Sequence, residues 1–142
     1  MPITKSNHCV YDTHYHLVMP LKYRKALLSA AVVATLRDTL KGIEERYDLQ
    51  IEQFGDDQNH VHVLVSFHPK YSVGQVVRLF KSITAKQVFA THPALKKDLW
   101  GGEFWTDGYY AATVGSGGTW AVVEEYIKHQ GRNPADLQVT LW

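Results

Sequence analysis

The sequence predicts a single α+β domain over residues 1–142, built on an antiparallel sheet. A chain of 142 residues that is 45% hydrophobic is long enough for one core and too short for two. Runs rich in β-branched and aromatic residues alternate with segments of helical apolar spacing. Short stretches rich in Gly, Pro and Asp separate these runs, so we expect the element order β-α-β-β-α-β-α.

The first half of the chain predicts a strand, a helix and a second strand. Residues 8–19 are rich in β-branched and aromatic residues, and Pro20 ends this strand. Residues 26–47 carry apolar residues at helical spacing, with charges on the opposite side. Residues 49–54 form the second predicted strand, and a turn follows at residues 55–57.

The third predicted strand, residues 59–67, carries two histidines on one face. Side chains of a strand point alternately to the two sides of a sheet. The apolar set faces the core: Val61, Val63, Val65 and Phe67. The polar set points the other way: His60, His62 and Ser66.

The second half of the chain adds a helix, a strand and a terminal helix. Residues 69–72 break the histidine strand, and residues 73–90 return to helical spacing. Residues 104–114 are aromatic and β-branched enough for a fourth strand. A glycine-rich hinge at residues 115–118 precedes a helix over residues 119–132, for which Thr119 is the expected N-cap.

This element order folds most simply as a ferredoxin-like arrangement. An antiparallel sheet carries two helices on one face, and the helix 119–132 is added at the C-terminal end. The open face of the sheet is then expected to carry His60 and His62.

Composition limits the kind of partner and the compartment. The lone Cys9 excludes an intramolecular disulfide and any Cys-rich zinc site, which suits a reducing compartment. The sequence has no signal-like apolar segment and no apolar run of transmembrane length, so we expect a cytoplasmic protein with no membrane partner. A formal net charge of +1 argues against nucleic-acid binding driven by bulk charge. Any nucleic-acid site must therefore come from local basic clusters.

Three such clusters are present: Lys22, Arg24 and Lys25; Arg78, Lys81 and Lys86; and Lys96 with Lys97. The first lies in the segment after the first predicted strand, and the second lies along one face of the second long helix at four-residue spacing. The alternative interpretation of the second cluster is an ordinary solvated helix face. The candidate DNA-binding residues are Lys22, Arg24, Arg78, Lys81, Ser82 and Lys86.

The histidine strand and the terminal helix together suggest a metal-assisted nucleophile. Two imidazoles that are two residues apart on a strand can hold one cation. Tyr126 and Gln130 are four residues apart, which places the phenol and the amide on one helix face. If that face meets the histidine strand, Gln130 supplies a third ligand and Tyr126 reaches the group that the metal polarises. The alternatives are hydrogen-bonded histidines, a packing tyrosine and a solvated amide.

His14 and His16 form a competing pair with the same two-residue spacing. The first strand is expected beside the third, so this pair lies near the first one. No matched nucleophile accompanies it, and the pair is interpreted as structural or as facing DNA.

Seven ordered segments of the chain resemble the HUH superfamily, in which a hydrophobic residue separates two metal-binding histidines. More narrowly, almost the whole chain resembles the small single-tyrosine transposases of the TnpA type, found in bacterial and archaeal insertion sequences. The matching segments are His16-Leu17-Val18 with Lys22-Tyr23-Arg24, Asn59-His60-Val61-His62-Val63-Leu64-Val65, Pro69-Lys70-Tyr71-Ser72-Val73, Leu79-Phe80-Lys81-Ser82, Trp100-Gly101-Gly102-Glu103-Phe104-Trp105, Gly108-Tyr109-Tyr110 with Thr113-Val114-Gly115, and Tyr126-Ile127-Lys128-His129-Gln130.

The resemblance implies that His60, His62 and Gln130 bind a divalent ion and that Tyr126 is the nucleophile. Two imidazole nitrogens and one amide oxygen suit Mn²⁺ well and Mg²⁺ adequately. The implied substrate is single-stranded DNA with hairpin ends, cut through a 5′-phosphotyrosine. The implied assembly is a homodimer with active sites completed in trans by the helix 119–132.

The chain departs from the family pattern at two positions. Asn59 stands where Asp is common before the first histidine, which bears on how the ring of His60 is held. Ser82 stands where Gly is common, which bears on helix packing or DNA contact. Neither departure removes a candidate catalytic group.

Two rival functions are considered beside an insertion-sequence transposase. One is a host-retained REP-associated tyrosine transposase, and the other is a catalytically silent nucleic-acid-binding module on the same sheet. Aromatic residues are expected either to stack unpaired bases or to pack in the core, and they are Trp105, Tyr109 and Tyr110.

Overall fold

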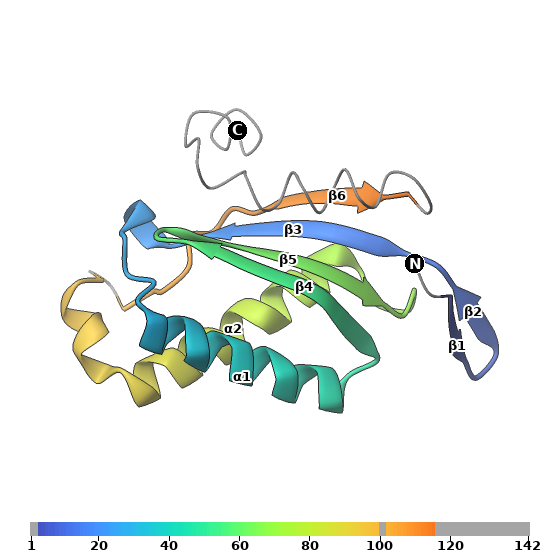
Figure 1. Cartoon of the computed structure of the whole chain (residues 1–142), viewed down its shortest axis with the longest axis horizontal. Coiled ribbons are helices and arrows are strands. Elements are labelled where there is room, and N and C mark those ends of the chain that lie inside the picture. Colours follow the sequence, from blue (N-terminus) through green and yellow to red (C-terminus); the bar gives the residue numbers. More distant parts are fainter. Residues whose placement is uncertain (1–2, 100–101, 116–142) are drawn as a thin grey trace.

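The computed structural model describes residues 3–99 and 102–115 as one sheet layer and one helix layer (Figure 1). The sheet consists of β3 (His14–Pro20), β4 (Leu49–Asp57), β5 (His60–Phe67) and β6 (Tyr110–Val114). The helices are α1 (Ala30–Arg46) and α2 (Val73–Thr91). Smaller elements are β1 (Thr4–Ser6), β2 (Cys9–Tyr11), η1 (Lys22–Arg24) and η2 (Pro93–Lys97).

The sheet has the strand order β4-β5-β3-β6, and every neighbouring pair is antiparallel. Helices α1 and α2 both cover the same face (Figure 1). The predicted α+β class is therefore confirmed, and the order β3-α1-β4-β5-α2-β6 is that of a ferredoxin-like unit. The predicted helix 119–132 lies outside the described residues.

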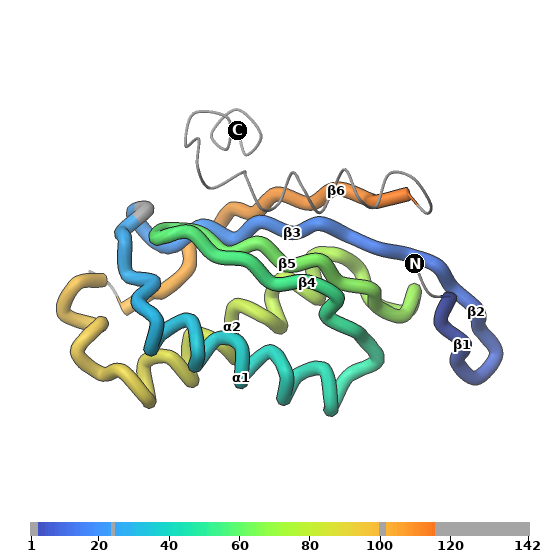
Figure 2. The backbone as a smooth tube through the Cα atoms, in the orientation of Figure 1, coloured from blue at the N-terminus to red at the C-terminus, as the bar shows by residue number. Residues whose placement is uncertain are grey.

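The two central strands, β3 and β5, run side by side through the middle of the sheet (Figure 2). Their register sets Val18 opposite His62 and His16 opposite Leu64. The alternating side chains between these positions join the core beneath the sheet, together with residues of both helices. The histidines of β3 and β5 thus share the face that points away from α1 and α2.

Both helices begin at a serine cap. The Ser29 hydroxyl accepts a hydrogen bond from the backbone N–H of Val32 at the start of α1. At the start of α2, Ser72 and Gln75 form a reciprocal capping box. The apolar stripes of both helices are buried largely as the spacing predicts: Val32, Leu36, Leu40 and Ile43 in α1, and Val76, Val77 and Phe80 in α2, where Val88 is buried as well.

Several predicted boundaries are wrong for identifiable reasons. Helix α1 begins at Ala30 instead of residue 26, since the Leu28 backbone N–H donates to Gln58 O and the chain is not yet helical there. Strand β4 continues through the predicted turn to Asp57, which pairs with His60. The turn therefore consists of two residues, Gln58 and Asn59.

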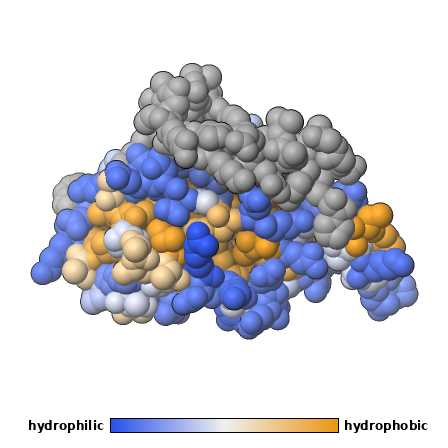
Figure 3. Space-filling view, viewed as in Figure 1, coloured by the Kyte–Doolittle hydropathy of each residue, from blue (hydrophilic) through white to orange (hydrophobic). Residues whose placement is uncertain are grey.

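The predicted strand over residues 8–19 is two strands. Its first part, β2, pairs with β1 in a hairpin that the sequence did not predict. The hairpin turn includes His8 at φ 62, a left-handed conformation that is uncommon outside glycine. Figure 3 shows apolar surface at this end of the molecule, where Ile3 and Val10 are 62% and 65% exposed.

The last predicted strand is shorter than expected. It begins at Tyr110 instead of residue 104, and Trp105 forms only an isolated bridge with Leu21, while Phe104 and Trp105 are buried in the core. Among the described residues, neither α1 nor α2 nor any shorter helix is long and apolar enough to cross a membrane.

Candidate active site

His60 and His62 meet on the sheet face that points away from the helices. Their ring centroids are 4.7 Å apart and the ring planes are 80° from parallel. Each residue is only 2% exposed. The structure therefore brings together the two histidines that the sequence singles out, in a buried position.

The hydrogen bond to His60 defines which of its nitrogens carries the proton. Asn59 Oδ1 accepts a hydrogen bond from Nδ1 of His60 at 2.7 Å. A neutral imidazole protonated at Nδ1 has its lone pair on Nε2. His60 thus presents Nε2 as a possible metal ligand.

His62 also has a buried ring nitrogen that could bind a metal. Its Nδ1 lies 3.5 Å from Nε2 of His16. Its Nε2 is buried and has no hydrogen-bond partner among the residues that the structure describes. A buried nitrogen without a partner is costly in a folded protein, and a metal ion would satisfy it.

The electrostatics keep His62 neutral. Burial, followed by the charges that His60 and His16 would carry, lowers the pKa of His62 from 6.5 to about 3. A metal binds the neutral imidazole, so His62 needs no deprotonation near pH 7 to act as a ligand. Both histidines therefore fit a divalent cation in donor type, and His62 also fits in its protonation state.

A third ligand is not found in the described part of the chain. No group of three or more His, Cys, Asp or Glu residues within 3–99 and 102–115 could hold a metal ion. The candidate third ligand Gln130 and the candidate nucleophile Tyr126 lie outside these residues, and their roles stay predictions.

The competing pair on β3 is divided between two environments. His14 lies between two carboxylates, with Asp12 Oδ1 and Glu52 Oε1 each 2.6 Å from one of its ring nitrogens. His16 belongs instead to the histidine cluster, because its ring is nearly parallel to that of His62 with centroids 5.7 Å apart. The sequence signal for His16 was its place on the strand expected to lie beside the third strand.

Four of the six candidate DNA-binding residues line one cleft. This basic cleft, about 650 Å³ in volume, lies between α2 and residues 102–109. Its floor is apolar, with Val77, Phe89 and Phe104 among the lining residues. The candidate residues along it are Arg78, Lys81, Ser82 and Lys86.

Within this cleft, Lys81 differs from the other two cations. Its Nζ donates to the carbonyl oxygens of Thr106 and Gly108 at 2.7 and 3.0 Å, and burial lowers its pKa. Arg78 and Lys86 are exposed. Lys81 therefore attaches the loop to α2, while Arg78 and Lys86 are accessible to a phosphate.

The remaining two candidate residues lie near the same loop. Lys22 forms an ion pair with Glu103 at 2.8 Å, and Glu103 also lines the basic cleft. The backbone of Arg24 ends η1, and its side chain is outside the described part of the structure.

The three aromatic candidates separate by burial. Trp105 is 5% exposed and its Nε1 donates to Thr84 Oγ1 at 2.9 Å, so it packs in the core and does not stack bases. Tyr110 packs against Val18. Tyr109 is 38% exposed on the wall of the basic cleft. Tyr109 is therefore the most exposed of the three and the one placed on the cleft to meet an unpaired base.

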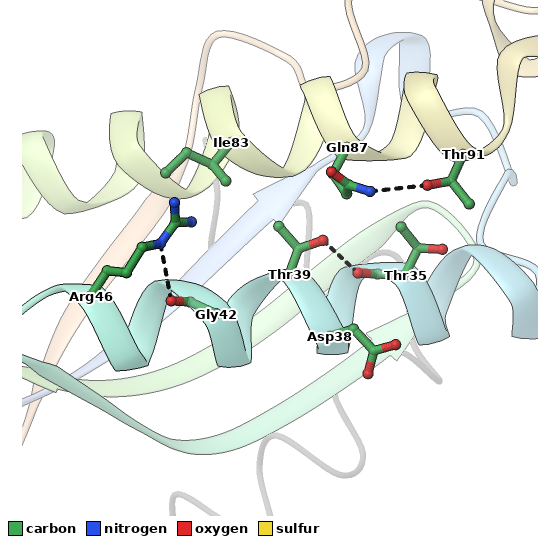
Figure 4. A pocket seen from close by; sticks show the side chains of 8 residues that line it. All are labelled: Thr35, Asp38, Thr39, Gly42, Arg46, Ile83, Gln87 and Thr91. Atoms are coloured by element: carbon green, nitrogen blue, oxygen red, sulfur yellow. Dashed lines mark hydrogen bonds between the residues drawn. The ribbon is translucent and has the colours of Figure 1, made fainter.

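A second hollow lies between α1 and α2 (Figure 4). It measures about 400 Å³, and the hydrogen bonds across its lining include Thr39 to Thr35 O and Gln87 to Thr91 within the helices, and a contact of 2.8 Å between Thr35 and His92. Asp38 and Arg46 are the charged residues among those that line it. Its lining contains neither the histidines of the outer sheet face nor the row of basic residues of the basic cleft.

An antiparallel α+β fold with a His-x-His strand at its centre is the arrangement of the HUH class. The family model described as "Transposase IS200 like" matches residues 9–130. The chain belongs to this family, and it is a single-tyrosine transposase of the TnpA type.

Individual relatives agree with this assignment. The chain is 33% identical over 130 residues to the ISDra2 transposase TnpA of Deinococcus radiodurans, covering 92% of each chain. It is 28% identical to the transposase for insertion sequence element IS200 of Salmonella typhimurium, over 87% of this chain and 80% of that one.

Solved structures show the same fold. A crystal structure of a transposase from Deinococcus radiodurans matches with a TM-score of 0.72 and 31% identity, over 89% of this chain and 97% of that one. A REP-associated tyrosine transposase, bound to a REP hairpin, matches with a TM-score of 0.60 over 87% of this chain and 69% of that one. Its 12% identity supports the fold alone.

Proposed function

We propose that this transposase cuts and rejoins single-stranded DNA at the ends of an insertion sequence through a covalent link to Tyr126. The observation that carries the proposal is the pair of buried imidazoles on β5, whose ring centroids lie 4.7 Å apart. Two adjacent buried imidazoles on a protein that belongs to a transposase family support a metal-assisted phosphoryl transfer.

The proposed cleavage step exchanges one phosphodiester for another. The Tyr126 oxygen forms a bond to phosphorus, and the bond from phosphorus to the 3′-oxygen breaks. The phenol loses its proton, and the 3′-oxygen takes up a proton to leave as a hydroxyl. A 5′-phosphotyrosine results, and a 3′-hydroxyl later attacks it to rejoin a strand. Because the phosphodiester energy is kept, no nucleotide cofactor is needed.

The proposed cofactor is Mg²⁺ or Mn²⁺. His60 and His62 would bind it through Nε2, and Gln130 would add an amide oxygen. When bound, such an ion neutralises a non-bridging phosphate oxygen and so lowers the barrier to attack by an anionic oxygen. Asn59 holds the ring of His60 in place for this role.

The basic cleft is the proposed path for DNA. Arg78 and Lys86 are exposed cations on the same side of α2. Tyr109 lines the same cleft and presents an aromatic ring. Single-stranded DNA binding combines such cations with stacking platforms. The hairpin-ended DNA of the family resemblance is the proposed partner; a solved structure of the same fold, from a REP-associated tyrosine transposase, is bound to a REP hairpin.

The proposed assembly is a homodimer in which the helix 119–132 of one subunit completes the histidine site of the other. The glycine-rich hinge at residues 115–118 supports this exchange, because glycine imposes few limits on the path of the chain.

The test uses labelled single-stranded oligonucleotides from the DNA that flanks the gene, incubated with Mn²⁺ or Mg²⁺. We expect a protein–DNA adduct that survives denaturation and disappears with EDTA and in Tyr126→Phe. Removal of one proposed metal ligand, in His62→Ala, should also abolish the adduct. Tight DNA binding without any adduct would contradict the proposal and favour the silent nucleic-acid-binding module.

A further inference from the structure

The two histidines on β5 are held by different partners. His60 donates from Nδ1 to Asn59, its neighbour in sequence. The partner of His62 comes from another strand, since Nε2 of His16 lies 3.5 Å from Nδ1 of His62. The contact joins β3 to β5 and depends on the register of these two strands.

Only one direction of this hydrogen bond suits His62 as a metal ligand. If His62 donates from Nδ1 to His16, the lone pair of His62 is on Nε2. If His16 donates instead, His62 carries its proton on Nε2. That N–H would be buried with no acceptor among the described residues, which is unfavourable.

The environment of His16 favours the accepting role. His16 is only 3% exposed, and so buried a position disfavours a charged ring. A neutral ring keeps a lone pair to accept with. The edge-to-face contact with Tyr110, at 5.9 Å and 72°, limits rotation of the His16 ring.

We propose that His16 is a positioning residue that accepts the Nδ1 proton of His62 and so fixes Nε2 of His62 as the metal-binding atom. This inference rests on the proposed metal-assisted function. A hydrogen-bonded partner of a ligating histidine fixes its tautomer and ring orientation. Removal of the partner typically lowers metal affinity about 10- to 100-fold.

The test combines a tautomer measurement with metal titration of the full chain. Long-range ¹H–¹⁵N correlation spectra of the metal-free protein report which nitrogen of His62 is protonated. Titration with Mn²⁺ alone gives the Kd. The variants are His16→Leu, which removes the acceptor, and His16→Gln, which restores one through its amide oxygen. His14→Gln is the matched control, because His14 is on the same strand and face and contacts carboxylates instead.

We expect wild-type His62 to be protonated at Nδ1, and His16→Leu to lose this preference and bind Mn²⁺ at least about tenfold more weakly. His16→Gln should recover most of the Nδ1 preference of His62 and most of the Mn²⁺ affinity. His14→Gln should match the wild type in both measurements. If His16→Leu binds as tightly as the wild type, or keeps the same His62 tautomer, the inference is wrong. Failure of the metal site itself gives a different result, in which the wild type and His62→Ala bind Mn²⁺ equally poorly. Far-ultraviolet circular dichroism verifies that each variant is folded.

Discussion

Asn59 Oδ1 lies 2.7 Å from Nδ1 of His60, so the residue before the first histidine of the pair fixes the orientation of its ring. An amide oxygen is a weaker acceptor than a carboxylate, and a carboxylate here would make the imidazole a stronger ligand. We therefore expect Asn59→Asp to bind Mn²⁺ more tightly than the wild type. Asn59→Leu should bind about tenfold or more weakly. Calorimetric titration measures both, and equal affinities in the three proteins would exclude this role of Asn59.

Lys81 is predicted to contribute to stability through the loop that it holds. Its two hydrogen bonds end on the carbonyl oxygens of Thr106 and Gly108. Hydrogen bonds to a charged group are worth about 1.5–3 kcal/mol each at best. We expect Lys81→Met to lower the free energy of unfolding by about 1–3 kcal/mol in urea titrations. Lys86→Met is the control on the exposed side of α2 and should change it by less than about 0.5 kcal/mol.

The fold could be predicted from sequence because its signals are local and repeated. The alternation over residues 59–67 fixes which side of β5 meets the core, and the apolar spacing fixes the buried faces of α1 and α2. The predicted element boundaries were wrong where a tertiary contact determines where a strand ends. The strand β4 runs on to Asp57 because β5 offers a partner there, which no local pattern announces.

The site was predictable in part for the same reason. The pairing of His60 with His62 follows from their spacing on one strand. The role of His16 depends on the register between β3 and β5, and a register cannot be obtained from either strand alone. Lys81 and Arg78 look alike in sequence as basic residues of one helix. Only the position of the 102–109 loop separates the lysine that holds the loop from the exposed arginine.

Arg78 and Lys86 are predicted to bind the DNA backbone. Each contact with a phosphate releases counterions, so the slope of log K against log salt should fall by about 0.7 for each cation removed from a single-strand site. We expect Arg78→Ala and Lys86→Ala to weaken binding of single-stranded oligonucleotides and to reduce this slope in fluorescence anisotropy. Lys41→Ala, an exposed cation on α1, is the matched control. If it shows the same loss, the basic cleft is not the DNA path.

The histidine cluster makes the stability of the metal-free protein depend on pH. Burial lowers the pKa of His16 to about 4 and, with its histidine neighbours, that of His62 to about 3. The unfolded chain binds these protons near pH 6.5 and the folded protein does not, so stability is lost as pH falls below about 6.5. Each of the two histidines contributes a slope of at most about 1.4 kcal/mol per pH unit.

Urea unfolding between about pH 8 and pH 5 measures this loss. His62→Asn should show a shallower dependence than the wild type, because one of the two groups is removed. An unchanged slope in that variant would show that other groups dominate the acid sensitivity.

Active sites completed in trans predict that two inactive variants can rescue each other. Tyr126→Phe lacks the nucleophile and keeps the histidine pair, whereas His60→Ala lacks a metal ligand and keeps the nucleophile. In a mixed dimer with exchanged helices, one of the two sites combines an intact histidine pair with an intact Tyr126. Random mixing of a two-fold dimer gives about half mixed dimers. Each mixed dimer has one intact site of its two, so adduct formation should recover to about a quarter of the wild-type level. If each site were completed within its own subunit, every site in the mixture would lack one group and no adduct would form.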